Sequence, residues 1–132
     1  MRALTPDDCP FCPPIDTRPL LESELAFAIF DRFPVNPGHV LVIPRRHVAD
    51  IFELTEGELR DVLRLLSLAR QRVAADFPVA GFNAGVNVGD AAGQTIAHAH
   101  VHLIPRYPGD VADPTGGVRG VIPGKSNYRK LV

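Results

Sequence analysis

The 132-residue sequence is poor in the residues and segments that would place it in a specialised class of protein. It contains two cysteines, one methionine and no tryptophan, so it is not a disulfide-rich secreted scaffold. No apolar run approaches the roughly 20 residues of a membrane span, and the N-terminus lacks the apolar segment of a signal peptide. We therefore expect a soluble, intracellular protein of the cytoplasm with no membrane partner.

The charge is also nearly balanced. Fourteen lysines and arginines face fifteen acidic residues, which gives a net charge of −1. This balance provides no basic surplus for a nucleic-acid partner, so any bound phosphate must be held by local geometry. With 45% apolar and 22% charged residues, the composition is that of one globular domain.

One helix is clearly predicted. Thr55-Glu56-Gly57-Glu58 is a capping box, which predicts a helix from there to about Phe77. Apolar residues at helical spacing would form its buried face: Leu59, Val62, Leu63, Leu66, Ala69, Val73 and Phe77.

Strands outnumber this helix. Apolar, β-type segments bounded by turn residues occupy 24–31, 39–48, 81–89 and 98–107. Short connections between several strands favour an antiparallel sheet, so the predicted fold class is α+β. Residues 108–132 are rich in glycine and proline and predict an irregular tail that belongs to the same domain.

Three of the five histidines stand at alternate positions, in the segment "HAHVH". In a strand, His98, His100 and His102 would share one face about 6.6 Å apart, and the apolar residues near them would face the core. Because a metal–nitrogen bond is only about 2.0–2.1 Å long, one ion could hardly bind all three. At least one imidazole is left for another task, although a merely polar strand face is the alternative.

A glycine-rich segment, "NVGDAAGQT" (87–95), precedes the histidines. Glycines allow successive backbone N–H groups to converge on phosphate oxygens, and Gln94 and Thr95 would add side-chain donors. The alternative is a plain hairpin turn. An anion cradle beside a nitrogen nucleophile is what phosphoryl or nucleotidyl transfer requires.

The segment from Gly93 to Ile104 resembles the histidine-triad (HIT) signature, and "NPGHVLVIPRRH" (36–47) resembles the other recurrent segment of that family. The resemblance covers most of residues 9–107, so it implies a HIT domain over 1–107. It also implies an antiparallel sheet with one long helix, joined to a second sheet across a homodimer. The third triad position is His rather than Gln, which favours a hydrolase over the transferase and phosphorylase branches.

The resemblance implies a catalytic role for each of three histidines. His100 would attack the α-phosphorus of a nucleotide and carry a covalent nucleotidyl intermediate. His102 would donate to phosphate oxygens, and His39 would support the nucleophile from the neighbouring strand. An imidazole near its usual pKa of about 6.5 is a competent nucleophile at pH 7.

The same resemblance implies the nucleotide-binding residues. Asp31 would accept both ribose hydroxyls, a role that suits a carboxylate, and Ile29 on the same strand face would pack under the base. A turn acid that ends the strand is the alternative for Asp31. The phosphates would be held by His102 together with the loop residues Asn87, Gly93, Gln94 and Thr95.

The cysteines form the motif Cys9-Pro-Phe-Cys12, which alone is typical of a metal knuckle, a redox pair or free thiols. With His47 and His98 they would complete a closed tetrahedral Cys₂His₂ set. The resemblance to bacterial HIT-like proteins implies a structural zinc in these places. No thioredoxin-like pattern follows the pair, which disfavours the redox interpretation.

The predicted substrate is therefore a nucleotide conjugate hydrolysed at its α-phosphorus, with dinucleoside polyphosphates as the first choice. Cleavage of a nucleoside phosphoramidate would use the same pocket and is the second enzyme hypothesis. A non-catalytic module that binds nucleotide or zinc is the third. The basic residues of the tail predict either a flap over the leaving group or a solvated segment.

Overall fold

The computed structural model describes residues 5–130, which contain one long helix, five strands and four short 3₁₀ helices. The elements in chain order are β1 (Leu21–Glu22), β2 (Ala26–Phe30), β3 (Val40–Pro44), η1 (Ile51–Glu53), α1 (Glu56–Asp76), β4 (Gly81–Val86), η2 (Asp90–Ala92), β5 (Val101–Arg106), η3 (Gly117–Val121) and η4 (Tyr128–Lys130).

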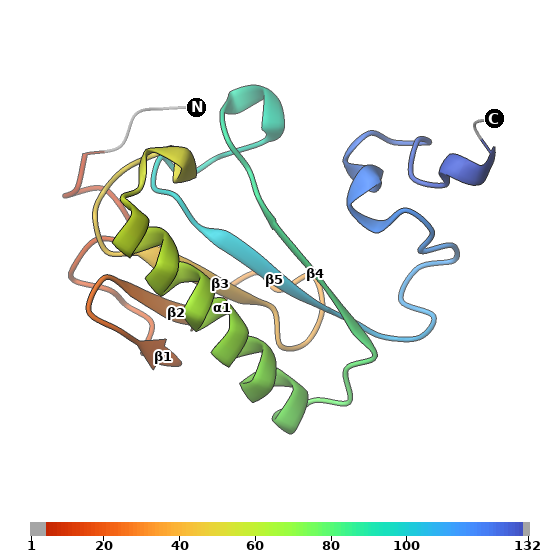
Figure 1. Ribbon diagram of the computed structural model, residues 1–132, viewed down its shortest axis with the longest axis horizontal. Coiled ribbons are helices and arrows are strands. Elements are labelled where there is room, and N and C mark those ends of the chain that lie inside the picture. The colour runs from red at the N-terminus through yellow and green to blue at the C-terminus, as the bar shows by residue number, and fades with distance from the viewer. Residues whose placement is uncertain (1–4, 131–132) are drawn as a thin grey trace.

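The five strands form one antiparallel sheet in the order β1-β2-β3-β5-β4. The helix α1 lies across one face of this sheet, as Figure 1 shows. This arrangement confirms the predicted α+β class with one long helix. The homodimer stays a prediction.

The capping box is present and fixes the start of α1. The Thr55 hydroxyl accepts the Glu58 backbone N–H, and the Glu58 carboxylate accepts the Thr55 N–H at 2.9 Å. The predicted apolar face was wrong at one position, because Leu63 is 63% exposed whereas Leu65 is buried. Helical spacing gives the direction of the apolar stripe but not its width, and here the sheet covers only a narrow stripe.

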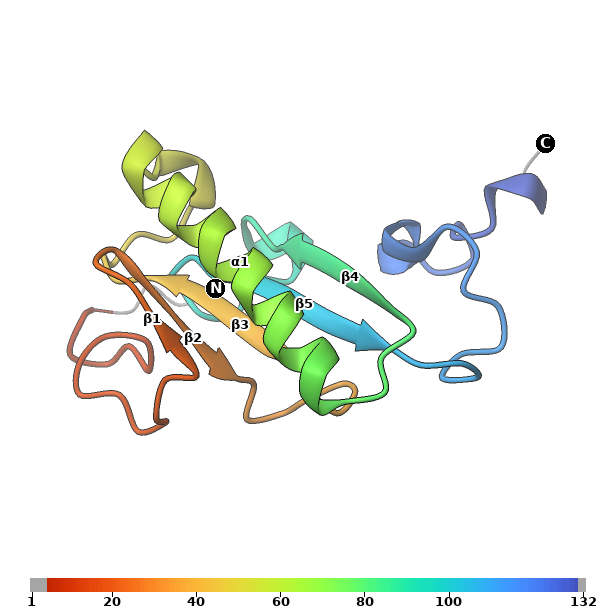
Figure 2. The ribbon, with the colours of Figure 1, turned by 60° about the horizontal axis from the view of Figure 1, so that its bottom comes forward.

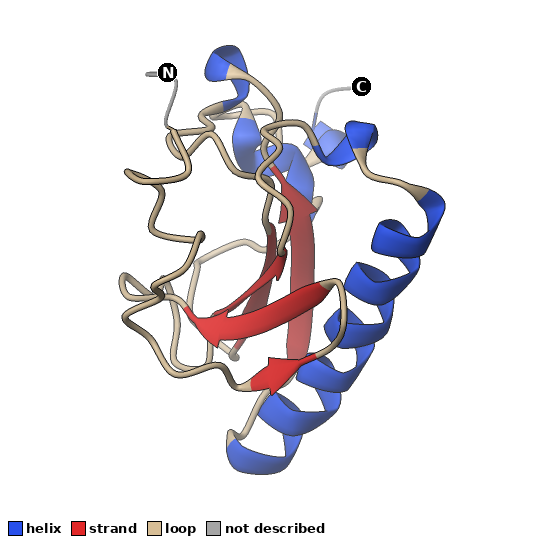
Figure 3. Cartoon of the chain, turned by 90° about the vertical axis from the view of Figure 1, so that its left-hand side faces the viewer, coloured by secondary structure: helices blue, strands red, loops and turns tan. Residues whose placement is uncertain are grey.

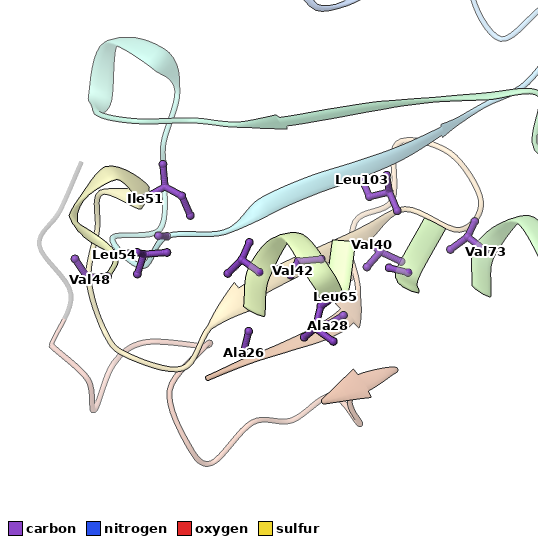
Figure 4. Packing of buried hydrophobic residues seen from close by; sticks show 13 residues of the cluster. Ala26, Ala28, Val40, Val42, Val48, Ile51, Leu54, Leu65, Val73 and Leu103 are labelled. Carbon is purple, nitrogen blue, oxygen red and sulfur yellow. The ribbon is translucent and has the colours of Figure 1, made fainter. Parts of the chain in front are cut away.

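The sheet has two apolar faces. Toward α1 it presents small residues such as Ala26, Ala28, Val40 and Val42, which pack around Leu65 in Figure 4. The alternate residues of β2 and β3 point the other way and pack against the N-terminal segment: Phe27, Ile29, Leu41 and Ile43. In the side view of Figure 3, α1 covers one face and loops cover the opposite one.

The ends of the strands differ from the predicted ranges, most of all at the histidine row. The predicted strand 98–107 begins only at Val101, because the Ala99 N–H donates to the Val48 carbonyl and not to the neighbouring strand. His98 and His100 therefore lie in a bend, outside the sheet. The two-residue strand β1 was not predicted, because so short a segment carries no periodic pattern.

The tail from residue 108 to residue 130 contains 3₁₀ turns as its only regular structure. In Figure 2 it extends beyond the end of the β4–β5 pair. Within the described residues, no helix is both long and apolar enough to cross a lipid bilayer.

Candidate active site and metal centre

The sheet face opposite α1 carries a cleft of about 350 Å³. Strand alternation brings Ile29 and Asp31 of the β2 segment, and His102 of β5, to this face, and Leu41 stands directly opposite His102 in the strand register. The cleft unites most of the residues predicted to bind nucleotide or to react: Ile29, Asp31, Asn87, Gly93, Thr95, His100 and His102.

His100 is buried and presents one ring nitrogen without a backbone partner. Its Nδ1 lies 2.8 Å from the carbonyl oxygen of His98. A carbonyl oxygen only accepts hydrogen bonds, so Nδ1 carries the proton and the neutral ring keeps its lone pair on Nε2. The backbone thus selects the tautomer in which His100 can act as a nucleophile through Nε2.

His39 and His102 form a hydrogen-bonded pair, of which only His102 lines this cleft. The Val35 N–H donates to Nδ1 of His39 at 3.2 Å, so Nε2 of the neutral His39 ring carries the proton. This Nε2–H faces Nδ1 of His102 at 3.0 Å and lies 3.5 Å from an Asp31 carboxylate oxygen. His102 therefore accepts at Nδ1 and keeps an Nε2–H donor for another ligand.

Burial keeps both of these rings neutral. Burial, together with the neighbouring His100 and His39, lowers the pKa of His102 to about 4. The pKa of His39 is also lowered by burial, although the Asp31 carboxylate opposes the shift. At neutral pH the pair is uncharged, so the hydrogen-bond directions given above apply.

Asp31, His39 and His102 lie close enough together to resemble a metal site. The Val35 N–H argues against that interpretation. A metal ion on Nε2 of His39 would require the proton on Nδ1, where it would face the Val35 N–H donor. The three side chains are better described as a hydrogen-bond relay.

The glycine-rich loop is closed by its own hydrogen bonds. The backbone N–H groups of Gly93 and Gln94 donate to carbonyls of Asp90 and Gly89, so they do not form the expected anion cradle. On this side the cleft lining includes two side chains that can donate, the Asn87 amide and the Thr95 hydroxyl. Gly93 has φ +83°, a left-handed conformation that favours glycine and turns the chain back toward the sheet.

The side chain of Gln94 does not line the cleft. Its amide oxygen accepts the Gly89 N–H, and its amide nitrogen donates to the carbonyls of Ala49 and Ile96. Every polar atom of this buried amide is thus engaged within the protein. Gln94 therefore holds the loop together, and a contact between Gln94 and a nucleotide stays a prediction.

Cys9, Cys12, His47 and His98 converge into one cluster that could hold a metal ion. Nδ1 of His98 lies 3.4 Å from the Cys9 sulfur, 3.6 Å from the Cys12 sulfur and 3.2 Å from Nδ1 of His47. The Cys12 sulfur lies 3.3 Å from Nδ1 of His47. The four predicted ligands come from the N-terminal segment, the residues after β3 and the bend before β5.

The protonation states in this cluster suit a cation. Nε2 of His98 donates to the Pro44 carbonyl at 2.7 Å, which leaves the Nδ1 lone pair directed at the cysteines. Burial, together with the adjacent Cys9, raises the pKa of the Cys12 thiol to about 11. A thiolate pair is therefore costly here unless a cation neutralises it.

Comparison with known proteins agrees with this geometry. The HIT domain model matches residues 13–109 of the chain. The chain belongs to the HIT family. A crystal structure of a HIT family protein from Bacillus anthracis superposes with a TM-score of 0.75 at 33% identity, and the match covers 96% of this chain and 94% of that one.

Two curated relatives of this HIT protein carry names of enzymes. The bis(5'-nucleosyl)-tetraphosphatase [asymmetrical] of Schizosaccharomyces pombe is 36% identical over 100 residues, which cover 76% of this chain and 55% of the relative. The AP-4-A phosphorylase of Mycobacterium tuberculosis is 36% identical over 88 residues, which cover 66% and 45%. The chain thus spans about half the length of these relatives.

Residues that were not predicted from the sequence also contribute to the candidate site. Phe11, between the two cysteines, lines the cleft, as do Leu41 and Ile96. The buried apolar position inside the Cys-x-x-Cys motif was a signal for Phe11. No pattern could have indicated Val35, because its backbone N–H rather than its side chain sets the His39 tautomer.

Proposed function

We propose that this HIT protein hydrolyses nucleotide conjugates at the α-phosphorus through a nucleotidyl-histidine intermediate. The observation that carries the proposal is the His100 ring, whose Nδ1–H is bound to a carbonyl and whose Nε2 lone pair is left for attack. The name of the yeast relative supports dinucleoside polyphosphates as the first-choice substrates.

In the first step, Nε2 of His100 attacks the α-phosphorus. A nitrogen–phosphorus bond forms while the bond between the α-phosphorus and the leaving-group oxygen breaks, and a nucleoside polyphosphate leaves as an anion that needs no proton. In the second step, a water oxygen attacks the same phosphorus, the nitrogen–phosphorus bond breaks, and one proton is released. The products are a nucleoside monophosphate and the remaining polyphosphate.

The neighbouring side chains would bind and orient the nucleotide. His102, held by the His39 relay, has its Nε2–H as a donor to non-bridging phosphate oxygens. The Asp31 carboxylate would accept ribose hydroxyls, although its Oδ1 already accepts the Phe33 N–H at 2.9 Å. Ile29 and Leu41, both buried, would lie under the base.

Zinc is the metal we propose for the Cys₂His₂ cluster. Zinc–sulfur bonds of about 2.3 Å and zinc–nitrogen bonds of about 2.0–2.1 Å imply sulfur–nitrogen edges of about 3.6 Å in a tetrahedron, close to the sulfur–nitrogen separations of 3.3–3.6 Å. All four positions would be filled by protein, so the zinc would stabilise the fold and leave the chemistry to the histidines.

The metal assignment predicts one zinc per chain by elemental analysis of the purified protein. Cys9→Ser should lose the metal, because a neutral hydroxyl replaces the thiolate ligand. His100→Ala should keep it, because Nδ1 of His100 bonds the His98 carbonyl and lies outside the cluster. Metal that persists in Cys9→Ser but disappears in His100→Ala would show that the histidines are wrongly divided between the two sites.

Nucleoside monophosphate release from diadenosine tetraphosphate tests the catalytic proposal. His100→Ala should lower the rate by on the order of 10³-fold or more, because the nucleophile is gone. Gln71→Ala, on the exposed side of α1, is the control. Wild-type protein that is denatured at alkaline pH during turnover, where a nitrogen–phosphorus bond survives, should carry an added nucleotidyl mass that His100→Ala lacks. An unchanged rate in His100→Ala would contradict the proposal.

The reaction products distinguish hydrolysis from phosphorolysis, and a second substrate tests phosphoramidate cleavage. Hydrolysis of diadenosine tetraphosphate gives AMP and ATP with or without added phosphate, whereas phosphorolysis gives ADP and ATP only when phosphate is present. A parallel assay with an adenosine phosphoramidate decides whether a nitrogen leaving group is preferred. No turnover of any of these substrates, combined with retained AMP binding, would favour the non-catalytic binding module.

A further inference from the structure

A buried aromatic ring lies between the metal cluster and the proposed nucleophile. The Phe11 ring meets the His98 ring edge-on, with centroids 5.9 Å apart, and meets the His100 ring at 5.2 Å and 63°. Phe11 is only 5% exposed. One side chain thus contacts a proposed metal ligand and the reactive imidazole at the same time.

The backbone of Phe11 is fixed by the cysteine turn. Its N–H donates to the Cys9 sulfur at 3.4 Å, and the Cys12 N–H donates to the Cys9 carbonyl at 3.3 Å. A thiolate bound to a metal accepts such N–H groups more strongly than a neutral thiol does. Metal occupancy should therefore fix the position from which the Phe11 ring projects.

The His100 ring contacts two other rings. Its centroid lies 5.2 Å from that of Phe11 and 5.1 Å from that of His102. The hydrogen bond from Nδ1 of His100 to the His98 carbonyl further restrains the orientation of the ring. Rotation of this ring would need Phe11 to move, because a 9% exposed side chain has little space of its own.

We propose that Phe11 is a positioning residue that transmits occupancy of the Cys₂His₂ site to the orientation of His100. One route runs from the Cys9 sulfur through the Phe11 N–H and ring, and the other runs from the His98 ring through the His98 carbonyl. The inference rests on the proposed function for its catalytic consequence, but the ring orientation can be measured without any substrate.

Histidine ¹⁵N NMR spectra test the first half of this inference. In the metal-loaded wild type, the His100 signals, identified by their absence in His100→Ala, should show a single Nδ1–H tautomer. Phe11→Leu keeps the buried apolar volume but loses the ring face, so both tautomers should appear. Phe52→Ala, which removes a 78% exposed ring, is the control and should match the wild type. A single tautomer in Phe11→Leu, with unchanged kcat, overturns the positioning role.

Kinetics give a second measurement on the same variants. Phe11→Leu should lower kcat by about 10- to 100-fold, because a misoriented nucleophile loses the attack geometry, while the dissociation constant for AMP changes less than threefold. Elemental analysis must show the wild-type metal content in this variant. If weaker AMP binding accounts for the whole loss of activity in Phe11→Leu, Phe11 lines the cleft but does not position His100.

Removal of the metal from the wild type tests whether occupancy of the Cys₂His₂ site affects the orientation of His100. Chelation of the wild type should broaden or double the His100 ¹⁵N signals, and added zinc should restore the single set. Unchanged signals in the metal-free protein overturn the coupling. If the wild type turns over no nucleotide, the proposed function fails while the spectra still decide whether Phe11 positions His100.

Discussion

The backbone partner of each histidine determines which ring nitrogen is available. The Pro44 carbonyl takes the Nε2–H of His98 and frees Nδ1 toward the cysteines, whereas the His98 carbonyl takes the Nδ1–H of His100 and frees Nε2. Adjacent members of one motif therefore present opposite nitrogens. This difference would allow the one histidine to bind the proposed metal and the next to attack phosphorus as proposed.

At the level of single residues, the pKa of His102 predicts how stability depends on pH. Its folded value of about 4 lies below its ordinary 6.5, so between these pH values the unfolded chain binds more protons. Stability from this group is present above pH 6.5 and is lost as the pH falls toward 4. Urea unfolding should show a loss of about 1–3 kcal/mol over this range.

The variant His102→Asn isolates this contribution. It keeps a polar side chain but has no titrating ring, so its free energy of unfolding should fall less between pH 6.5 and pH 4 than that of the wild type. Because His39 and His100 contact His102, the difference between the two proteins measures the contribution of His102 together with its coupling to these two rings. If the free energy of unfolding falls equally with pH in the two proteins, the lowered pKa does not belong to His102.

At the level of elements, one carboxylate joins the start of α1 to the end of β3. Glu58 caps the helix and also receives two nitrogens of the Arg46 guanidinium, at 3.0 and 2.9 Å. This hydrogen bonding lowers the pKa of Glu58 to about 2. Because Glu58 is 5% exposed, the pair is screened less than a surface ion pair.

Glu58→Ala should therefore lower the free energy of unfolding by about 1–3 kcal/mol, since it removes a cap and leaves Arg46 without its main partner. Urea denaturation at pH 7 measures this change. Glu56→Ala, an exposed acid in the same helical turn, is the matched control and should change stability by less than about 0.5 kcal/mol. Equal effects of the two substitutions would mean that the Arg46 pair contributes nothing.

Elements with a local signal could be predicted from the sequence. The capping box located the start of α1, and the apolar runs located β2 and β3 within a few residues. The bend that removes His98 and His100 from β5 could not be predicted, because a tertiary hydrogen bond from Ala99 to Val48 overrides the strand pattern. Leu65 was missed because burial of a helix face depends on how much of it the sheet covers.

The candidate site shows the same division. The Cys-x-x-Cys motif together with the family resemblance predicted the four members of the metal cluster, and the structure brings these four residues together. The sequence did not indicate which of two neighbouring loop side chains faces the cleft. Gln94 hydrogen-bonds inside the loop, whereas Thr95 lines the cleft. Side-chain direction within an irregular loop depends on its internal hydrogen bonds, and these have no periodic signature.

At the level of the whole molecule, the chain has a packed body and a tail with little buried surface. The body ends in an ion pair, because Arg106 donates to both oxygens of Asp110 at 2.8 Å. Beyond Asp110 no described residue is buried, and several large apolar side chains are exposed: Val111, Val118, Val121, Ile122 and Tyr128. The predicted homodimer, which sedimentation equilibrium can test, would offer such side chains a partner.

A second cleft, of about 530 Å³, links this tail to the site. His102 and Asn87 belong to both clefts, and the tail supplies Val118 and Val121 to the second one only. If the nucleotide occupies the first cleft, the leaving group faces the second. The tail should therefore affect the leaving group and not the nucleoside.

Deletion of residues 111–132 tests this division of roles. The shortened chain should unfold within about 4 °C of the full one, because no described residue of the core is removed. AMP should bind it equally well within twofold, because the tail does not line the first cleft. A selective loss of kcat/KM for diadenosine tetraphosphate would make the tail a flap over the leaving group, and an unchanged value would make it a solvated segment. Loss of AMP binding would contradict the placement of the nucleoside in the first cleft.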